Sequence, residues 1–298
     1  MLTLHHLDPS SVWPFVLLVK PALRQRLLHW HEEANLVVLG ASFGRQPMGA
    51  AVALRGDEAA HLLDLYILPG YRSSGFGTAL LAEAETHIAQ TGLARIQARY
   101  DQNEHTPAFE SVLAKRGWVR PTVTHRVFAT TREQAIINSR WVQRYRFRPP
   151  YQAVPWSDVC EADRQAIAER GKRGWYPSHR SPLQRPTDTW DSETSLALRY
   201  KGEVVGWALT IREAPDQLLV DILFVDPPLQ RLGKGFMLIG EVIRRCWQVG
   251  IEYTYWQVRP DNKAMLRWSR RAFDGALADE YDERYSEKNL AHPIPPVD

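Results

Sequence analysis

Two stretches decide the fold of this chain: Arg72-Ser-Ser-Gly-Phe-Gly77 and Gln230-Arg-Leu-Gly-Lys-Gly235. The second follows the first by 158 residues (230 − 72). Each comes after a run of strand-forming residues that ends in a proline, Pro69 or Pro227, and each leads into an amphipathic segment. A strand, a glycine turn and a helix that repeat in register predict a duplicated domain built to hold a phosphate.

The segments around these stretches repeat as well. In each half the sequence predicts a strand hairpin, a strand that leads into the glycine loop, a helix, a further strand and a second helix. The helix after the second loop, for example, places Leu238, Val242 and Cys246 on one face. We therefore expect an α/β (α+β) fold of two domains, each a mixed, mostly antiparallel sheet flanked by helices. The expected ranges are 35–41, 49–54, 61–68, 78–90, 95–100 and 108–116 in the first half, and 195–200, 204–211, 217–225, 236–249, 252–259 and 263–271 in the second.

The size and composition fit two globular domains. The chain has 298 residues, of which 44% are hydrophobic and 24% charged. An Arg- and Pro-rich stretch at 144–150 interrupts the repeat, so we expect domains at 1–135 and 136–298. The net charge of +3 suits an anionic ligand and is too small to predict nucleic-acid binding. We expect the three arginines at 144, 146 and 148 to lie on the exposed side of a strand, with Tyr145 and Phe147 facing inward.

Other classes of protein and site find no support in the sequence. The apolar stretch at 12–19 contains Pro14 and is shorter than the roughly 20 residues of a membrane span, and the N-terminus does not resemble a signal peptide. Cys160 and Cys246 are too few for a disulfide framework, which predicts a reducing, cytoplasmic location. His29 and His31 point to different helix faces, so we expect no metal site. We expect no membrane or nucleic-acid partner, and either a monomer or a homodimer.

The glycine loops favour a pyrophosphate as the ligand. The start of a helix exposes unpaired N–H groups and the positive end of the helix dipole. Glycines let a phosphate reach those amides, and Lys234, Arg231 and Arg72 add positive charge. Taken singly, each loop has a second interpretation, a close crossing of helix and strand. Neither copy ends in the Gly-Lys-Ser/Thr of a P-loop, and neither has the third glycine and distant acidic residue of a dinucleotide fingerprint.

At this point the chain resembles the Gcn5-related N-acetyltransferase (GNAT) superfamily. The signature of that superfamily is Gln/Arg-x-x-Gly-x-Gly/Ala between the fourth strand and the third helix, and both stretches match it in full. Upstream, Gly49 and Gly206 occupy the expected strand hairpins, and a later strand ends near Asn262. The resemblance covers nearly the whole chain as a tandem pair, and it implies that the ligand is acetyl-CoA, or another acyl-CoA, with no metal.

The resemblance also implies which residues contact acetyl-CoA. Its pyrophosphate would lie on the amides of either loop, and its pantetheine arm would run along the backbone near Val225 or Ile67, where two parallel strands splay apart. The implied cofactor residues are Val225, Gln230, Arg231, Leu232, Gly233, Lys234, Gly235 and Asn262 in the second half, and Ile67, Arg72, Ser73, Ser74, Gly75, Phe76, Gly77 and Thr78 in the first.

For catalysis, the family needs a base that deprotonates the ammonium and an acid, often a tyrosine, that protonates the thiolate. Asp221 is our candidate base; the alternative is that its carboxylate is solvated or salt-bridged and plays no part in catalysis. For Asp64, the first-half counterpart, we expect a structural role. The usual tyrosine position holds Trp268 in the second half and Leu113 in the first. We take Tyr255 as the substitute acid; Tyr253, Tyr100 or departure of a free thiolate stay open.

The acceptor is expected beside the segment 171–182. There Trp175, Tyr176 and His179 are candidate acceptor contacts for a small-molecule or peptide amine; a surface loop with packed aromatics is the alternative. The resemblance thus implies an acetyl-CoA-dependent N-acetyltransferase whose C-terminal domain is catalytic. Two alternatives stay open, a non-catalytic CoA-binding or interaction module and an acyltransferase that uses a longer acyl-CoA.

Overall fold

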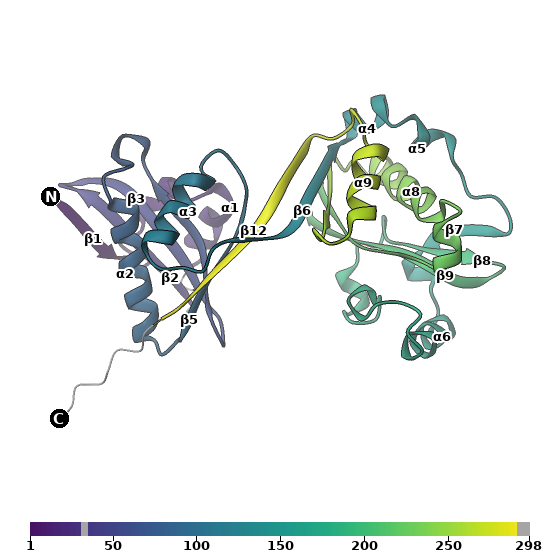
Figure 1. Ribbon diagram of the computed structural model, residues 1–298, viewed down its shortest axis with the longest axis horizontal. Coiled ribbons are helices and arrows are strands. Elements are labelled where there is room, and N and C mark those ends of the chain that lie inside the picture. Colours follow the sequence, from purple (N-terminus) through teal and green to yellow (C-terminus); the bar gives the residue numbers. More distant parts are fainter. Residues whose placement is uncertain (31–34, 291–298) are drawn as a thin grey trace. The chain divides into compact units, whose positions relative to one another are not determined.

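The computed structural model describes residues 1–30 and 35–290; His31, named above as a metal candidate, and the segment 291–298 lie outside them. Contacts divide the chain into two units. Unit 1 comprises Met1–Thr124 and the C-terminal segment from Asp282, and unit 2 comprises His125–Tyr281. Figure 1 shows the elements of both units. No helix in the described ranges is long and apolar enough to cross a membrane.

Unit 1 is a mixed sheet with the strand order β1-β2-β3-β4-β5-β12. Every neighbouring pair is antiparallel except β4 and β5, which are parallel. Its strands are β1 (Leu2–His6), β2 (Leu36–Phe43), β3 (Gln46–Arg55), β4 (Ala60–Ile67), β5 (Arg95–Asp101) and the larger part of β12 (Asp279–Asn289), and its helices are η1 (Trp13–Leu18), α1 (Pro21–Leu28), η3 (Pro69–Tyr71), α2 (Phe76–Gln90) and α3 (Thr106–Lys115).

Unit 2 repeats this plan with the strand order β7-β8-β9-β10-β11-β6, in which only β10 and β11 are parallel. Its strands are β6 (Thr122–Thr131), β7 (Tyr151–Pro155), β8 (Leu196–Tyr200), β9 (Glu203–Ala214), β10 (Gln217–Val225) and β11 (Tyr253–Val258). Its helices are α4 (Arg132–Asn138), α5 (Arg140–Arg144), η4 (Trp156–Asp158), α6 (Glu161–Lys172), η5 (Ser178–Arg180), η6 (Thr187–Thr189), α7 (Pro227–Gln230), α8 (Lys234–Gln248) and α9 (Lys263–Ala272).

Each face of the unit 2 sheet carries its own apolar core. Leu238, Val242 and Cys246 of α8 are buried against Leu218 of β10, as the helical spacing predicts. On the other face, Ile167 of α6 packs among aromatic side chains of the sheet. Figure 1 shows α8 and α9 on one side of this sheet and α6 on the other. The fold expected from the sequence, a mixed sheet flanked by helices in each half, is confirmed.

Glycine is required where the strand hairpin approaches the strand that leads into each loop. A Cβ built on Gly206 of β9 would lie 2.7 Å from the Phe224 carbonyl oxygen, and one on Gly49 of β3 would lie 2.8 Å from the Tyr66 carbonyl oxygen. These distances are shorter than a carbon–oxygen contact allows, so any side chain there would push the strands apart. The two upstream glycines therefore serve strand packing.

Two strands cross from one unit to the other. β6 begins in unit 1 and β12 begins in unit 2, and the division into domains 1–135 and 136–298 stays a prediction. The strand expected around residues 144–148 is absent, because helix α5 ends at Arg144 and the chain is irregular up to Tyr151. The prediction that Tyr145 faces inward was wrong, since it is 47% exposed.

Candidate functional site

The site begins where β10 and β11 separate. Their parallel pairing extends from Gln217 with Tyr253 to Val220 with Trp256. Beyond that point both strands continue, β10 to Val225 and β11 to Val258, without pairing to each other. The backbone edges that face this gap can therefore bond to a ligand instead of to a strand. Such a gap between parallel strands is where the sequence resemblance puts the pantetheine arm.

The glycine loop of unit 2 closes this gap at the start of α8. Gly233 is the N-cap of the helix with φ of +70°, a left-handed conformation that favours glycine, and no side chain caps the helix. The N–H groups of its first turn therefore have no helical acceptor. Among the described residues, the only atom beyond the chain neighbours of Gly235 that a Cβ there would meet within 4 Å is Val225 Cγ2, at 3.7 Å. Protein packing thus leaves room at Gly235 for an anion to reach these amides.

Two cations lie in this loop. Lys234 is the first residue of α8, and its Nζ lies 4.2 Å from the ring centroid of Tyr151 and 3.8 Å from Met237 Sδ. Arg231 is exposed. Within residues 1–30 and 35–290, neither cation forms an ion pair with a carboxylate. The loop therefore combines a free helix N-terminus with uncompensated positive charge, which suits a pyrophosphate.

The first residue of each glycine stretch holds its loop to the preceding strand. Gln230 Nε2 donates to the Val225 carbonyl oxygen at 2.6 Å, and Arg72 Nε donates to the Ile67 carbonyl oxygen at 2.9 Å. The two bonds span the same five residues in the two units. These side chains thus shape the loop. Each of them also occupies one lone pair of the carbonyl oxygen that it binds, at Val225 or Ile67.

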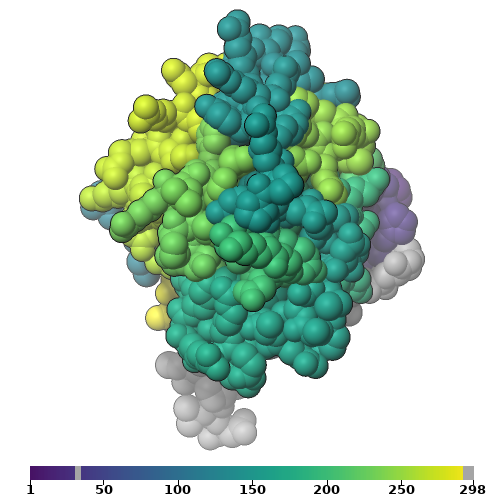
Figure 2. Space-filling model, turned by 90° about the vertical axis from the view of Figure 1, so that its right-hand side faces the viewer, coloured from purple at the N-terminus to yellow at the C-terminus, as the bar shows by residue number. Residues whose placement is uncertain are grey.

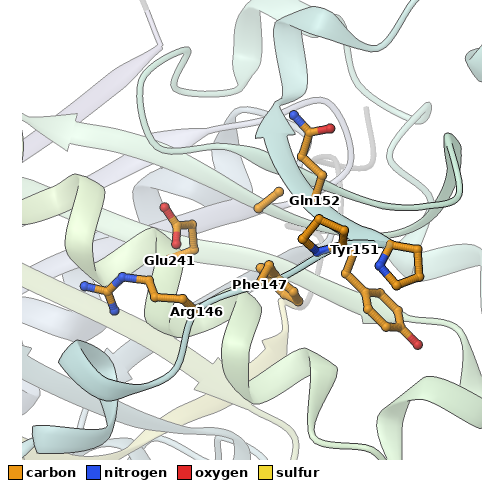
Figure 3. Close-up of a pocket in the computed structure, with 8 residues that line it drawn as sticks. Arg146, Phe147, Tyr151, Gln152 and Glu241 are labelled. Atoms are coloured by element: carbon orange, nitrogen blue, oxygen red, sulfur yellow. The ribbon is translucent and has the colours of Figure 1, made fainter.

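A cavity of about 430 Å³ lies in unit 2, between α8 and the chain that leads into β7. Figure 3 shows Arg146 and Glu241 at one end, Phe147 in the middle and Tyr151 at the other. Tyr151 connects this cavity to the glycine loop, because its ring also contacts Lys234.

Asp221, the candidate base, lies in a network of charges. Its Oδ2 accepts a hydrogen bond from Arg185 Nη1 at 2.9 Å. Burial raises the pKa of the Asp221 carboxyl above its ordinary value; Arg185 opposes this shift, and the charge of Glu213 adds to it. Glu213 Oε2 in turn accepts a hydrogen bond from the Tyr255 hydroxyl at 2.5 Å. Glu213 therefore connects the two candidate catalytic residues, and a carboxyl with a raised pKa is suited to accept a proton.

A β-bulge sets the position of Asp221. The register between β9 and β10 shifts between Val220 and Ile222. Val220 packs in the core beneath α8, whereas Ile222 packs in the core on the α6 side. In a regular strand these two residues would face the same side. Asp221 is the extra residue of the bulge, and such bulges often redirect a side chain next to a site.

The expected acceptor residues lie mostly in the core. Trp175 and Tyr176 pack edge-on against Trp207 with centroids 5.6 and 5.2 Å apart, and Tyr176 is buried. Trp175 Nε1 also donates to Asp226 Oδ1 at 2.9 Å, at the residue that precedes the glycine loop. His179 is exposed on η5, which lies beside β10. Of the three, His179 alone presents an exposed side chain near the candidate base strand.

An aromatic cluster covers the far side of the loop. The ring of Phe236, in the first turn of α8, lies 3.7 Å from Trp141 of α5 and 5.9 Å from Trp268 of α9, between centroids. Trp141 Nε1 donates to the Ala272 carbonyl oxygen at 2.8 Å, so α5 ties α8 to α9. Figure 2 shows the teal α4–α5 segment between the yellow-green and yellow surfaces of these helices. Asn262 Oδ1 caps α9 by accepting from the Met265 N–H at 3.2 Å.

Unit 1 repeats the loop geometry with less charge and less room. Where unit 2 has Lys234, unit 1 has Phe76, whose ring packs against Tyr71 at 6.4 Å. A Cβ on Gly77 would lie 3.6 Å from the Ile67 side chain and 3.7 Å from Val112 of α3. In the loop of unit 1, Gly75 caps α2 with φ of +81°, and Ser73 has φ of +64°. Ser74 is exposed and Thr78 is partly buried. In the loop of unit 2, the predicted residue Leu232 is 63% exposed.

The two helices of unit 1 are also held together by a buried carboxylate. Glu85 of α2 accepts from Trp118 Nε1 at 2.7 Å, from Arg116 Nη2 at 2.6 Å and from Lys288 Nζ at 2.6 Å. The corresponding residue of unit 2 is the apolar Ile243. Unit 1 is therefore fixed by ionic contacts at a place where unit 2 has an ordinary apolar core.

Sequence reasoning missed three residues of the site: Arg185, Glu213 and Tyr151. Arg185 is separated from Asp221 by 36 residues, and Glu213 from Tyr255 by 42. No local motif marks these positions. The one available signal was that Glu213 lies next to the last residue of β9, close to the turn into β10 and at the same end of the sheet as Tyr255.

Comparisons with known proteins agree with this geometry. The acetyltransferase (GNAT) family pattern matches residues 4–111 and 164–273. A tandem GNAT protein from the clavulanic acid biosynthesis pathway is similar in structure, with a TM-score of 0.63, 14% identity and coverage of 99% of this chain and 100% of that one. A GCN5-related N-acetyltransferase from Sphaerobacter thermophilus has a TM-score of 0.63, 15% identity and coverage of 98% and 97%. These identities support the fold alone. A search of curated proteins gave no match.

Proposed function

Since the chain belongs to the acetyltransferase (GNAT) family, we propose that it transfers an acetyl group from acetyl-CoA to an amine of a small molecule or peptide, with unit 2 as the catalytic unit. One observation carries this proposal. Unit 2 combines separated parallel strands, room at Gly235 and two cations, Lys234 and Arg231, that form no ion pair with any described residue, whereas Phe76 and Val112 reduce charge and room in unit 1.

The residues of unit 2 fit the cofactor. The amides from Arg231 to Gly235 would hold the pyrophosphate, and the free edge of β10 near Val225 would hold the pantetheine arm. Bound acetyl-CoA supplies the acyl group as a reactive thioester. Asp221 accepts a proton from the acceptor ammonium at Oδ2, directly or through water, and its raised pKa makes it a better base than an ordinary aspartate. The Tyr255 hydroxyl, oriented by Glu213, is the proposed proton donor.

The test is CoA release from acetyl-CoA across a panel of amines, compared between the wild type and Asp221→Asn. We expect turnover to fall by a factor of about 100 or more, which is the usual contribution of a general base, while acetyl-CoA affinity stays nearly the same. Unchanged turnover would exclude Asp221 as the base.

A non-catalytic CoA-binding module is the second candidate, favoured by Trp268 at the position where the family has its tyrosine. Its ring packs against Phe236 and cannot protonate a thiolate. Acetyl-CoA binding without CoA release for any amine would support this candidate. Transfer of a longer acyl group is tested by thermal shifts with acetyl-CoA and longer acyl-CoAs, since a ligand at a hundred times its Kd stabilises by about 2.7 kcal/mol. The free thiols Cys160 and Cys246 are compatible with the cytoplasmic location that we also propose.

A further inference from the structure

Opposite charges lie side by side at the candidate base. Asp221 Oδ2 and Arg185 Nη1 are 2.9 Å apart, and their side chains are 21% and 47% exposed. Arg185 comes from the chain between η5 and η6, and its guanidinium lies 5.3 Å from the ring centroid of Trp190. Ion pairs with this much exposure contribute little to stability. A ligand that offers the same two charges can therefore replace each partner at small cost.

A second cation, Arg180, precedes this segment directly and forms no ion pair among the residues that the structure describes. Arg180 is the last residue of η5, which lies beside β10, and its backbone carbonyl accepts from Trp207 Nε1 at 3.0 Å. Its side chain is partly buried, and within the described part of the chain it forms no ion pair. Burial lowers the pKa of the Arg180 guanidinium. A desolvated, uncompensated cation is costly unless a ligand supplies the anion.

We propose that the acceptor of unit 2 carries an oxyanion, a carboxylate or a phosphate, beside the amine that it presents. The proposal rests on the acetyltransferase function proposed above. The ammonium of such an acceptor takes the place of the Arg185 guanidinium at Asp221. Arg185, then free, and Arg180 donate to the oxyanion, which a planar guanidinium binds with two parallel hydrogen bonds.

The other charges around Asp221 agree with this orientation. A second carboxylate, that of Glu213, acts on Asp221 through its charge. Glu213 Oε2 accepts a hydrogen bond from the Tyr255 hydroxyl. Negative charge on that side favours an ammonium and repels an oxyanion, whereas the segment of Arg180 and Arg185 favours the oxyanion. An amine that carries no oxyanion would displace Arg185 from Asp221 and leave the charges of Arg185 and Arg180 uncompensated, so it should bind less well.

The experiment follows the side-chain Nε–Hε resonances of Arg180 and Arg185 in the full-length protein, assigned with Arg180→Lys and Arg185→Lys. The probes are glycine, L-leucine and O-phosphoethanolamine, each matched with a partner that lacks the oxyanion: glycinamide, L-leucinamide and ethanolamine. We expect at least one oxyanion-bearing amine to shift both resonances at a concentration about tenfold lower than its partner does. The carboxylate and phosphate probes distinguish the two kinds of oxyanion. Equal responses to amines with and without the oxyanion, or no shift with any oxyanion-bearing amine, would overturn the proposal.

Variants give an independent readout. Arg180→Gln and Arg185→Gln should each reduce the preference for oxyanion-bearing amines about fivefold or more. Arg173→Gln, which changes an exposed arginine at the end of α6, should keep that preference. Arg180→Gln should unfold at no lower temperature than the wild type, because it removes a cation without a partner. Preferential binding of oxyanion-bearing amines without CoA release would overturn acetyl transfer and leave this inference standing. CoA release only with amines that lack an oxyanion would support acetyl transfer and overturn this inference.

Discussion

Replacing Gly235 by alanine separates the stability of unit 2 from its ability to bind a ligand. The new Cβ would lie 3.7 Å from Val225 Cγ2, an ordinary van der Waals contact, and Gly235 is the second residue of α8. Alanine in a helix is more stable than glycine by roughly 0.5–1 kcal/mol. For a unit of this size, that gain raises Tm by roughly 1–4 °C. The protein without ligand should therefore be as stable as the wild type or more stable.

Ligand affinity should change in the opposite direction. The Cβ would occupy the space through which a phosphate reaches the amides at the start of α8. Losing one charge-assisted hydrogen bond costs about 1.5–3 kcal/mol, which is roughly a tenfold to 150-fold rise in the Kd for acetyl-CoA. The assay combines thermal unfolding without ligand and calorimetric titration with acetyl-CoA.

Two matched variants complete this experiment. Gly77→Ala makes the same change in unit 1 and should leave the affinity unchanged if only unit 2 binds acetyl-CoA. Gly206→Ala should destabilise the fold by about 1–3 kcal/mol, because its Cβ would lie 2.7 Å from the Phe224 carbonyl oxygen. If Gly235→Ala bound acetyl-CoA as tightly as the wild type, or unfolded at a lower temperature, the reasoning about free space in the loop would be refuted.

Three further substitutions test the charges and contacts around the site. Burial raises the pKa of Asp221 in the native state, so the native state binds the proton more tightly than the unfolded state does, and the free energy of unfolding falls as pH rises from about 3.9 through the raised pKa. Asp221→Asn should therefore raise Tm at pH 7 and lose that advantage at pH below about 3.9. A Tm below that of the wild type at pH 7 would contradict this sign. Glu85→Gln should lower the free energy of unfolding, measured with urea, by about 3 kcal/mol, because it removes the charge of a buried carboxylate that accepts hydrogen bonds from Trp118 at 2.7 Å and from two cations. The affinity for acetyl-CoA should not change. Trp175→Phe keeps an aromatic ring but loses the bond to Asp226, so it should raise the Kd for acetyl-CoA more than the KM of the acceptor; the opposite order would favour direct contact with the acceptor.

The repeated elements could be predicted from the sequence because their signals are local. The alternation of β10 and the spacing of Leu238, Val242 and Cys246 each fix an element and its buried face within a short window. Likewise, a strand followed by Gly233 and Gly235 is enough to predict the turn into α8. As divisions of a duplicated sequence, the boundaries 1–135 and 136–298 stay a prediction.

The rest depends on contacts between residues distant in the sequence. The bulge at Asp221 arises from the register between β9 and β10, so counting along one strand cannot reveal it. The partner of Asp221, Arg185, comes from a loop without a motif. Trp175 is of a residue type that often contacts ligands, but its packing against Trp207 depends on how the whole sheet face packs.

The two glycine loops show which positions of the shared pattern relate to a ligand. Gln230 and Arg72 make the same bond to a strand carbonyl in both units. Because this bond occurs in both units, the first position of the pattern does not distinguish one loop from the other. Lys234 is different, because its charge has no carboxylate partner within the described residues, and Phe76 replaces it in unit 1. Charge at this position, together with an unfilled glycine after it, is therefore the feature that favours a ligand in unit 2 over unit 1.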